Sequence, residues 1–302
     1  MRWSRTLALG ASVLVLIGAC TTGGGSKPAI KIGSVGFDEA RIMAEAYAQV
    51  LENAGYTVNR DGIGLGDRKV LLPALESGQI DLQPEYIGSG LAAGYGGTAT
   101  GDPKANVAAL QAILDGKGGG ITVLGYTPAQ DQNAFVVRKE TADQYSLARM
   151  SDVAAVQDKL KLGLAKDCPT NPLCGTALKD AYGIDVSAAT LLDACSTPMA
   201  QALAAKTIDL GELCSTQPDI IVNGFVLLQD DKQTQPADNI APLVRNDFLA
   251  KTDKAAFSAL LNGLSAKVDT ATLAELYKEV SVDKKDVKDV VATWLKAQGL
   301  TK

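Results

Sequence analysis

The chain has 302 residues, with 29 lysines and arginines against 34 aspartates and glutamates, which gives a net charge of −5 at pH 7. An acidic chain without basic blocks disfavours nucleic acid and anionic lipid surfaces as partners, because like charges repel. The sequence contains no histidine, and this absence removes the commonest general base and most of the support for a hydrolase.

The N-terminus has the layout of an export signal. Arg2 and Arg5 precede the uncharged run 6–19, which is too short to span a bilayer stably. The run ends Leu-Ile-Gly-Ala before Cys20, an arrangement that resembles a lipobox. We therefore predict a signal peptide at residues 1–19, lipidation of the Cys20 thiol, and a flexible leash at 20–29 that tethers an extracytoplasmic protein to the cell membrane. An ordinary signal peptide with a cysteine near its cleavage site is the alternative.

The stretch at residues 70–86, VLLPALESGQIDLQPEY, is the most informative part of the first half of the chain. Its apolar residues repeat at helical spacing until Ser77 and Gly78 stop the helix, and a short strand is predicted at residues 80–82. Pro84 lacks a backbone donor and is expected to end that strand. Tyr86 would then lie where a parallel sheet opens onto its ligand crevice. We take Tyr86 as the first candidate ligand contact.

A glycine-rich segment, GIGLG at residues 62–66, superficially resembles a phosphate-binding loop. Its spacing fits neither the dinucleotide fingerprint nor the nucleotide loop that ends in Lys-Ser/Thr. A turn is the better interpretation, and we expect no cofactor.

Alternating strand and helix patterns predict two α/β lobes joined by two crossings, the first at residues 127–131 and the second at residues 230–239. Lobe I takes residues 30–127 and 236–302, and lobe II takes residues 128–235. In lobe II we expect a strand at 133–138 and another at 220–228. Paired crossings form a hinge, and a cleft lies between the lobes.

Of the five cysteines, setting Cys20 aside leaves four in the middle third of the chain. An even number in an exported protein indicates disulfides. Three pairings are possible, and we favour Cys168 with Cys174, which closes a proline-rich loop, and Cys195 with Cys214, which ties a helix to the next strand. A zinc site is the rival interpretation; with no histidine and an oxidising compartment, we expect no metal.

Several segments together carry a resemblance to a known family. They are KIGS at residues 31–34, the predicted helix at 38–51, the stretch at 70–86, AFVVR at 134–138, AYG at 181–183, LLQDDK at 227–232 and APLVR at 241–245. In their order and spacing they resemble the substrate-binding proteins of ATP-driven importers for quaternary-ammonium osmoprotectants such as glycine betaine, choline and carnitine.

The resemblance implies an α/β, two-lobed periplasmic-binding-protein fold of the type II clamshell kind, with two crossover hinge strands. It implies a monomer that captures a small solute and delivers it to the permease and ATPase subunits of an importer, and it implies no enzyme activity. A ligand-sensing or scavenging lipoprotein that is not coupled to transport is an alternative which the sequence leaves open. A fold of this kind can also carry enzymes, but no nucleophile and base pair supports one.

The resemblance also implies a cage of tyrosines around the ammonium group, with a lysine, an arginine and a hydroxyl clamping the carboxylate. Tyr86 matches a cage tyrosine, and Ser89 matches the hydroxyl. The positions of the other anchors hold different residue types here: Val35 for the lysine, Asn133 and Cys214 for tyrosines, and Asn171 for the arginine.

These replacements remove the partners that a betaine needs, because a buried carboxylate requires charge-assisted bonds and a trimethylammonium group requires several aromatic faces. The remaining candidate ligand-binding residues are Tyr86, Ser89, Gln132, Asn133, Phe37 and Gln217. Such a set suits a neutral polyhydroxylated or phenolic ligand. A quaternary-amine site rebuilt from other residues is the alternative. Each candidate also has a structural explanation: Phe37 as a helix staple, for example, and Gln132 and Asn133 as hinge residues.

Overall fold

A computed structural model describes residues 27–118 and 120–302. The predicted signal peptide and the predicted lipidation site Cys20 lie outside the described residues. Over the described part of the chain, no helix combines the length and the apolar character that a membrane span requires.

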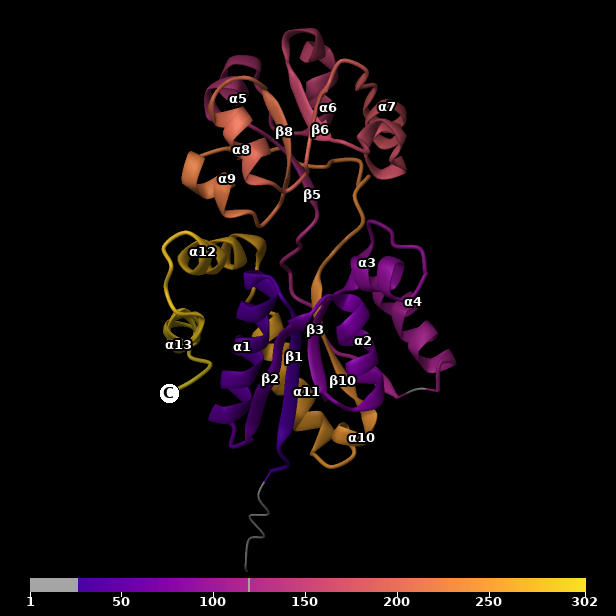
Figure 1. Ribbon diagram of the computed structural model, residues 1–302, viewed down its shortest axis with the longest axis vertical. Helices are drawn as coiled ribbons and strands as arrows, with labels where there is room; N and C mark the ends of the chain where they lie inside the picture. The colour runs from indigo at the N-terminus through magenta and orange to yellow at the C-terminus, as the bar shows by residue number, and fades with distance from the viewer. Residues whose placement is uncertain (1–26, 119) are drawn as a thin grey trace, which may run out of the picture.

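The first sheet, over the described residues, has five strands and defines lobe I (Figure 1). Its strands in spatial order are β2 (Val58–Gly66), β1 (Ile30–Val35), β3 (Leu82–Tyr86), β10 (Ile240–Arg245) and β4 (Ile121–Val123). The helices of this lobe are α1 (Asp38–Asn53), α2 (Arg68–Ser77), α3 (Ile87–Ser89) with the π-helical turn η1 (Gly90–Gly94), α4 (Pro103–Gly116), α10 (Asn246–Leu249), α11 (Lys254–Ser265), α12 (Thr270–Ser281) and α13 (Val287–Ala297).

The second sheet, again over the described residues, has five strands and defines lobe II. Its strands in spatial order are β7 (Thr190–Leu192), β6 (Leu162–Ala165), β8 (Leu210–Cys214), β5 (Asn133–Val137) and β9 (Val226–Leu227). The helical segments are α5 (Lys139–Tyr145), α6 (Met150–Val153) with η2 (Ala154–Lys159), η3 (Cys168–Thr170), η4 (Pro172–Thr176), α7 (Ala177–Tyr182), α8 (Thr197–Ala204) and α9 (Pro218–Asn223).

The two sheets are built alike around the strands that follow the crossings. β5 is the first strand of lobe II, and it pairs antiparallel with β8 and β9. β10 is the strand that returns to lobe I, and it pairs antiparallel with β3 and β4. Each crossing therefore leads into an inner strand of the sheet that it enters. This arrangement confirms the predicted two-lobed α/β fold, and it holds both crossings firmly at their ends.

Each lobe has its own core. Lobe I packs α1 against its sheet through fully buried side chains such as Ile42, Met43 and Tyr47. Lobe II buries one cluster on each face of its sheet, around Phe135 on one face and around Met199 on the other. Helix α12 contacts both α1 of lobe I and α9 of lobe II, and Figure 1 shows it beside the junction of the lobes.

Capping side chains explain where several helices begin. Asp67 accepts hydrogen bonds from the backbone amides of Lys69 and Val70 at the start of α2. Gly78 ends the same helix with a φ of 82°, a left-handed conformation that favours glycine. The predicted helix and its stop at Ser77 and Gly78 therefore match the structure.

Pro84 does not end its strand, contrary to the prediction. β3 continues to Tyr86, and Pro84 lies directly opposite Pro242 of β10. The two prolines face each other in an antiparallel pair that needs no amide donor between them. On the other side, pairing of β3 with β1 is limited to Leu82 and Ile32, so the missing donor of Pro84 costs little there.

Two other segments also differ from their predictions. Residues 62–66 belong to strand β2 rather than to a turn; a Cβ at Gly62 would lie 2.8 Å from the Ile32 carbonyl oxygen, so glycine is needed here for close strand packing. Residues 218–223 form helix α9 where a strand was expected, because Pro218 begins the helix and Gly224 ends it with a φ of 61°.

Candidate functional site

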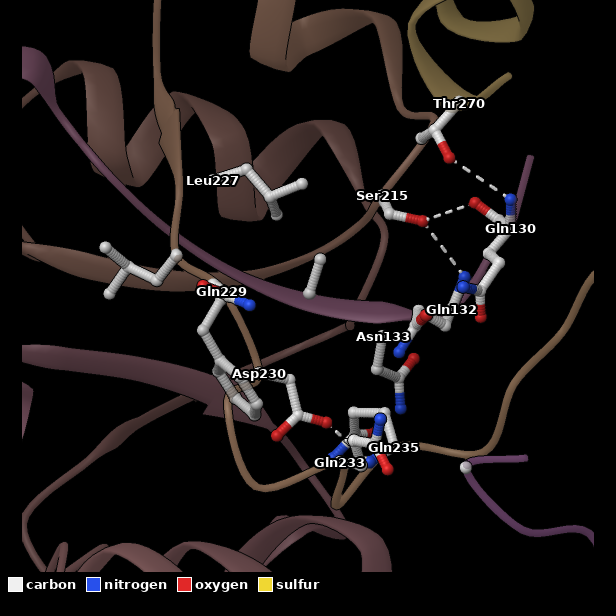
Figure 2. A pocket seen from close by; sticks show the side chains of 14 residues that line it. Gln130, Gln132, Asn133, Ser215, Leu227, Gln229, Asp230, Gln233, Gln235 and Thr270 are labelled. Carbon is white, nitrogen blue, oxygen red and sulfur yellow. Dashed lines mark hydrogen bonds between the residues drawn. The ribbon is translucent and has the colours of Figure 1, made fainter. Parts of the chain in front are cut away.

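The candidate site lies at the crossings between the lobes, where the described structure contains two adjoining cavities of about 430 Å³ each. The first, here called the aromatic cavity, is lined by Phe37, Tyr86 and Ser89 of lobe I and by Asp131 and Asp238 of the crossings. The second, here called the amide cavity, is lined by lobe II and the crossings, with Gly101 and Thr270 contributed by lobe I (Figure 2). Gln132, Asn133 and Gln235 line both cavities, so the two form one continuous cleft.

Tyr86 and Phe37 form the aromatic wall. Their ring centroids lie 5.6 Å apart with an interplanar angle of 40°. Tyr86 is buried, with 4% of its surface exposed, whereas Phe37 is 42% exposed. The Tyr86 hydroxyl donates a hydrogen bond of 2.5 Å to Glu39 Oε1 in the first turn of α1. The wall is therefore fixed by a buried polar contact, and Phe37 is its accessible part.

Ser89 is tied to Asp238 of the second crossing. The Ser89 backbone amide donates to Asp238 Oδ1 at 2.9 Å, and its hydroxyl donates to Oδ2 at 2.6 Å. Burial raises the pKa of Asp238, although the bonds from Ser89 act in the opposite direction. Because the Ser89 hydroxyl donates its only proton to Asp238, it can accept a hydrogen bond from a ligand but cannot donate one.

Asp131 of the first crossing is the second carboxylate of the cavity. It accepts a hydrogen bond of 2.8 Å from the Thr216 hydroxyl of lobe II, and its backbone amide donates to the Asp238 carbonyl oxygen at 3.2 Å. Burial raises the pKa of Asp131 to about 6. For Glu39, burial and then the nearby charge of Asp131 raise the pKa to about 8.

Among the described residues that line the aromatic cavity, Arg68 is the one cationic side chain, and it already forms an ion pair. Arg68 Nη2 lies 2.8 Å from Glu85 Oε1, and Glu85 is 2% exposed. Desolvation by burial raises the pKa of Glu85. Among the described residues, no Lys or Arg forms an ion pair with Glu39, Asp131 or Asp238, although the charge of Arg68 also acts to lower the pKa of Asp238.

The amide cavity is rich in carboxamide side chains, contributed by Gln130, Gln132, Asn133, Gln229, Gln233 and Gln235 (Figure 2). Ser215 positions the first crossing: its hydroxyl donates to the Gln130 carbonyl oxygen at 2.7 Å and accepts from the Gln132 amide at 3.1 Å. Gln235 donates to the Leu173 carbonyl oxygen at 2.7 Å. The side-chain amides of Gln132 and Asn133 make no hydrogen bond to any described residue, which leaves them available to a ligand.

The structure thus brings together five of the predicted ligand-binding residues: Phe37, Tyr86, Ser89, Gln132 and Asn133. Gln217 is not among the lining residues of either cavity. Its amide nitrogen donates to Asp219 at 2.7 Å and its oxygen faces the Cys214 amide at 3.5 Å, because the residue sits at the start of helix α9. The prediction of Gln217 as a ligand contact is therefore not supported by its position.

Sequence reasoning missed the charged part of the site. Glu39, Asp131 and Asp238 were not selected, nor was Gln235. Asp131 directly precedes Gln132, and Asp238 lies within the second predicted crossing. Acidic residues on both crossings were the available signal, because both crossings must pass the cleft.

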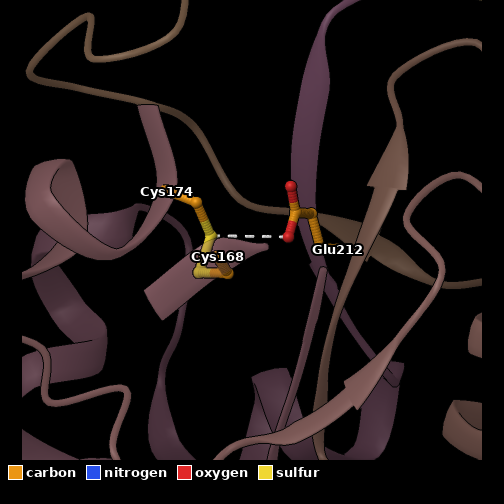
Figure 3. Close-up of side chains that lie close together, drawn as sticks. All are labelled: Cys168, Cys174 and Glu212. Atoms are coloured by element: carbon orange, nitrogen blue, oxygen red, sulfur yellow. Dashed lines mark hydrogen bonds between the residues drawn. A yellow bond between two sulfur atoms is a disulfide. The ribbon is translucent and has the colours of Figure 1, made fainter. Parts of the chain in front are cut away.

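Both favoured disulfides are present, with Cα atoms 4.9 Å apart in each: Cys168–Cys174 and Cys195–Cys214. Cys214 lines the aromatic cavity. Glu212 lies beside the first disulfide, with its Oε2 3.5 Å from Cys174 Sγ (Figure 3). The two sulfur atoms and a carboxylate oxygen of Glu212 lie within 4.8 Å of one another, and all are of kinds that can bind a metal. The sulfurs are bonded to each other, however, and offer no thiolate.

Comparison with known proteins identifies the family of this chain. Residues 28–297 match the family described as the substrate binding domain of the ABC-type glycine betaine transport system. The chain belongs to this family. Its members are solute-binding proteins of ABC transporters and not enzymes.

Individual relatives agree with this assignment. The chain is 27% identical to the glycine betaine-binding protein YehZ of Escherichia coli (strain K12), over 98% of this chain and 99% of that protein. It is 25% identical to the carnitine transport binding protein OpuCC of Listeria monocytogenes, over 90% of this chain and 88% of that protein. The structure of apo YehZ superposes with a TM-score of 0.80 at 25% identity, covering 90% of this chain and 99% of that one.

Proposed function

We propose that this protein is the extracytoplasmic solute receptor of an ABC importer, which captures a small solute between its lobes and delivers it to the permease and ATPase subunits. The observation that carries the proposal is the position of the cleft. Its walls come from lobe I, from lobe II and from both crossings, so a bound solute contacts every part that must move in closure. Membership of a family of transport binding proteins supports it.

The proposal includes a lipid anchor on Cys20 and a monomeric receptor. The lipobox-like run before Cys20 supports the anchor, because a receptor tethered by a short leash stays close to its permease. A sensing or scavenging role remains the alternative for a receptor of this kind. Co-purification with a permease in a ligand-dependent manner favours transport, and its absence with a saturating ligand favours sensing.

A small organic cation is the first candidate ligand. The aromatic wall of Phe37 and Tyr86 offers a face to a cation, and Asp131 and Asp238 supply negative charge beside it. The relatives are named for glycine betaine and carnitine, which both contain a quaternary ammonium group. Here carboxylates would provide much of the attraction that additional aromatic faces would otherwise provide.

A neutral polyhydroxylated or phenolic ligand, as the sequence predicts, is the second candidate. The free amides of Gln132 and Asn133 favour it, because each amide can donate and accept hydrogen bonds to hydroxyl groups. The carboxylates without cationic partners favour the cation more strongly.

Calorimetric titration of the mature protein tests the proposal. The panel contains choline, glycine betaine and carnitine beside sugars, polyols and phenolics, and each ligand is also titrated into Tyr86→Ala. We expect at least one solute to bind and to lose affinity in Tyr86→Ala. A panel in which nothing binds, or a ligand whose affinity is unchanged in Tyr86→Ala, contradicts a receptor role for this cleft.

A further inference from the structure

Three carboxylates that are distant in the sequence converge behind the aromatic wall. Glu39 comes from the first turn of α1, Asp131 from the first crossing and Asp238 from the second crossing. Tyr86 bonds to Glu39, and Ser89 bonds to Asp238. The backbone bond from Asp131 to Asp238 joins the two crossings directly. The charges of Asp131 and Asp238 both act on Glu39, and that of Asp238 acts on Asp131, so the three side chains form one group, here called the acidic triad. Asp131 and Asp238 line the aromatic cavity, whereas Glu39 is fully buried and does not line it.

No lysine or arginine among the described residues forms an ion pair with a member of the acidic triad, although the nearby charge of Arg68 acts to lower the pKa of Asp238. Arg68, the cation that lines the cavity, is bonded to Glu85 by both Nε and Nη2. The Thr216 hydroxyl has a single proton, and it donates this proton to Asp131 Oδ1. Glu39 Oε2 is buried with no hydrogen-bond partner among the described residues. Asp131 and Asp238 accept hydrogen bonds but form no ion pair. A buried negative charge without an ion-paired cation is costly, so a positive group in the aromatic cavity would stabilise the ionised carboxylates.

We infer that Glu39, Asp131 and Asp238 determine specificity in the cleft, by selecting an organic cation that carries no carboxylate. The inference rests on the proposed receptor function and names the ligand class more narrowly. A carboxylate on the ligand would enter the negative field of the triad, and the described lining residues offer no unpaired Lys or Arg to hold it. The positions at which the family resemblance implies a lysine and an arginine hold Val35 and Asn171, and Asn171 caps the backbone of Leu173.

The rest of the cleft suits the polar end of such a cation. The free amides of Gln132 and Asn133 can donate to a hydroxyl oxygen, and the Ser89 hydroxyl can accept its proton. A hydroxylated quaternary or protonated amine would therefore place its charge near the triad and its hydroxyl toward the amides.

A ligand series on the wild-type mature protein tests the inference without any variant. Choline, its uncharged isostere 3,3-dimethylbutan-1-ol and the zwitterion glycine betaine share the same branched head. We expect choline to bind at least about tenfold more tightly than either of the others. If glycine betaine or the neutral isostere binds as tightly as choline, the inferred selection by the acidic triad is wrong, but the receptor function is not contradicted. If no member of the series or of the wider panel binds, both proposals fail.

Isosteric variants then assign the effect to the triad. Asp131→Asn, Asp238→Asn and Glu39→Gln each replace one carboxyl group by an amide and keep the side-chain shape. We expect the ratio of choline affinity to glycine betaine affinity to fall at least about tenfold in Asp131→Asn and Asp238→Asn. Asp158→Asn, an exposed acid in lobe II, is the matched control and should keep the wild-type ratio. A ratio that does not change in the folded triad variants, judged by thermal unfolding, overturns the assignment.

Discussion

The hydrogen bond of 2.5 Å from the Tyr86 hydroxyl to Glu39 Oε1 joins the carboxyl end of β3 to the first turn of α1. Both residues are buried, Tyr86 at 4% and Glu39 at 0% exposure. The bond fixes the aromatic ring against the cleft and gives Glu39 one of its few partners. The ring of Tyr86 thus forms part of the aromatic wall, and its hydroxyl stabilises a buried carboxyl group of lobe I.

Tyr86→Phe separates these two roles. The ring remains, so ligand affinity should change little, but Glu39 loses its donor and the protein should lose about 1 to 3 kcal/mol of unfolding free energy. Urea unfolding measures the loss. Tyr145→Phe is the control, because Tyr145 makes no hydrogen bond through its hydroxyl to a described residue. Equal stability of Tyr86→Phe and the wild type would contradict the structural role of the hydroxyl.

Stability should depend on pH through Glu39. Burial and the charge of Asp131 raise its pKa from 4.5 to about 8 in the folded protein. Between these values the folded state binds more protons than the unfolded state, so this contribution is present in full below about pH 4.5 and is lost as the pH rises toward about 8. Asp131 acts in the same direction, with a pKa raised by burial from 3.8 to about 6.

Thermal unfolding of wild type and Glu39→Gln at a series of pH values tests this dependence. The glutamine can still accept the Tyr86 hydrogen bond but does not titrate, so the slope of melting temperature against pH should be shallower in the variant. Tyr86 and Tyr277 also face the carboxylates, and burial raises the pKa of both, that of Tyr277 to about 12, so neither titrates in this range. Parallel slopes in the two proteins would show that Glu39 is not the group responsible.

Binding of a cation should release protons, because a positive ligand favours the ionised carboxylates and lowers their pKa values. Affinity for choline should therefore rise with pH across the range in which Glu39 and Asp131 titrate. Calorimetry in buffers of different ionisation enthalpy counts the released protons. Proton uptake on binding, or affinity that is independent of pH, would be the opposite of this expectation.

The architecture was predictable because its signals are local. Helical spacing, the capping aspartate Asp67 and the stop at Gly78 identify α2, and the position of Tyr86 at a strand end identifies the aromatic wall. One error arose where pairing overrides local preference, and another where two local signals conflict. Pro84 stays within β3 because it faces Pro242, a partner more than a hundred residues away. The β-branched run at residues 220–222 predicted a strand, but Pro218 and Gly224 set the limits of a helix.

The acidic triad could not be predicted from local pattern. Its members are at positions 39, 131 and 238, and only the pairing of β3 with β10 and the path of both crossings bring them together. The sequence indicated that the quaternary-amine cage was depleted, but it did not show what replaces the missing partners. The predicted preference for a neutral ligand therefore omitted the charge that the fold concentrates in the cleft.

The two disulfides should differ in their effect on binding. By the chain-entropy model each contributes roughly 2 to 3 kcal/mol, with more from the longer loop; their sequence separations are 19 for Cys195–Cys214 and 6 for Cys168–Cys174. The double variant Cys195→Ala/Cys214→Ala should lose stability and also ligand affinity, since Cys214 lines the aromatic cavity. Cys168→Ala/Cys174→Ala is the comparison and should lose mainly stability. Free thiols at these cysteines in the exported wild-type protein would contradict both pairings.

Ligand binding should bring the lobes together about the two crossings. The hinge is well defined at its ends, because the crossings lead into the inner strands β5 and β10, and Asn239 bonds the second crossing to the first through the Thr127 carbonyl oxygen at 2.9 Å. Asp131 and Asp238 lie on these crossings, so a cation that they bind contacts the hinge itself. Small-angle scattering of the mature protein should show a smaller radius of gyration with saturating ligand than without it. Asp131→Asn at the same ligand concentration should keep the larger radius, because its site is less occupied. An unchanged radius in the fully liganded wild type would mean that solute capture in this protein does not proceed by closure.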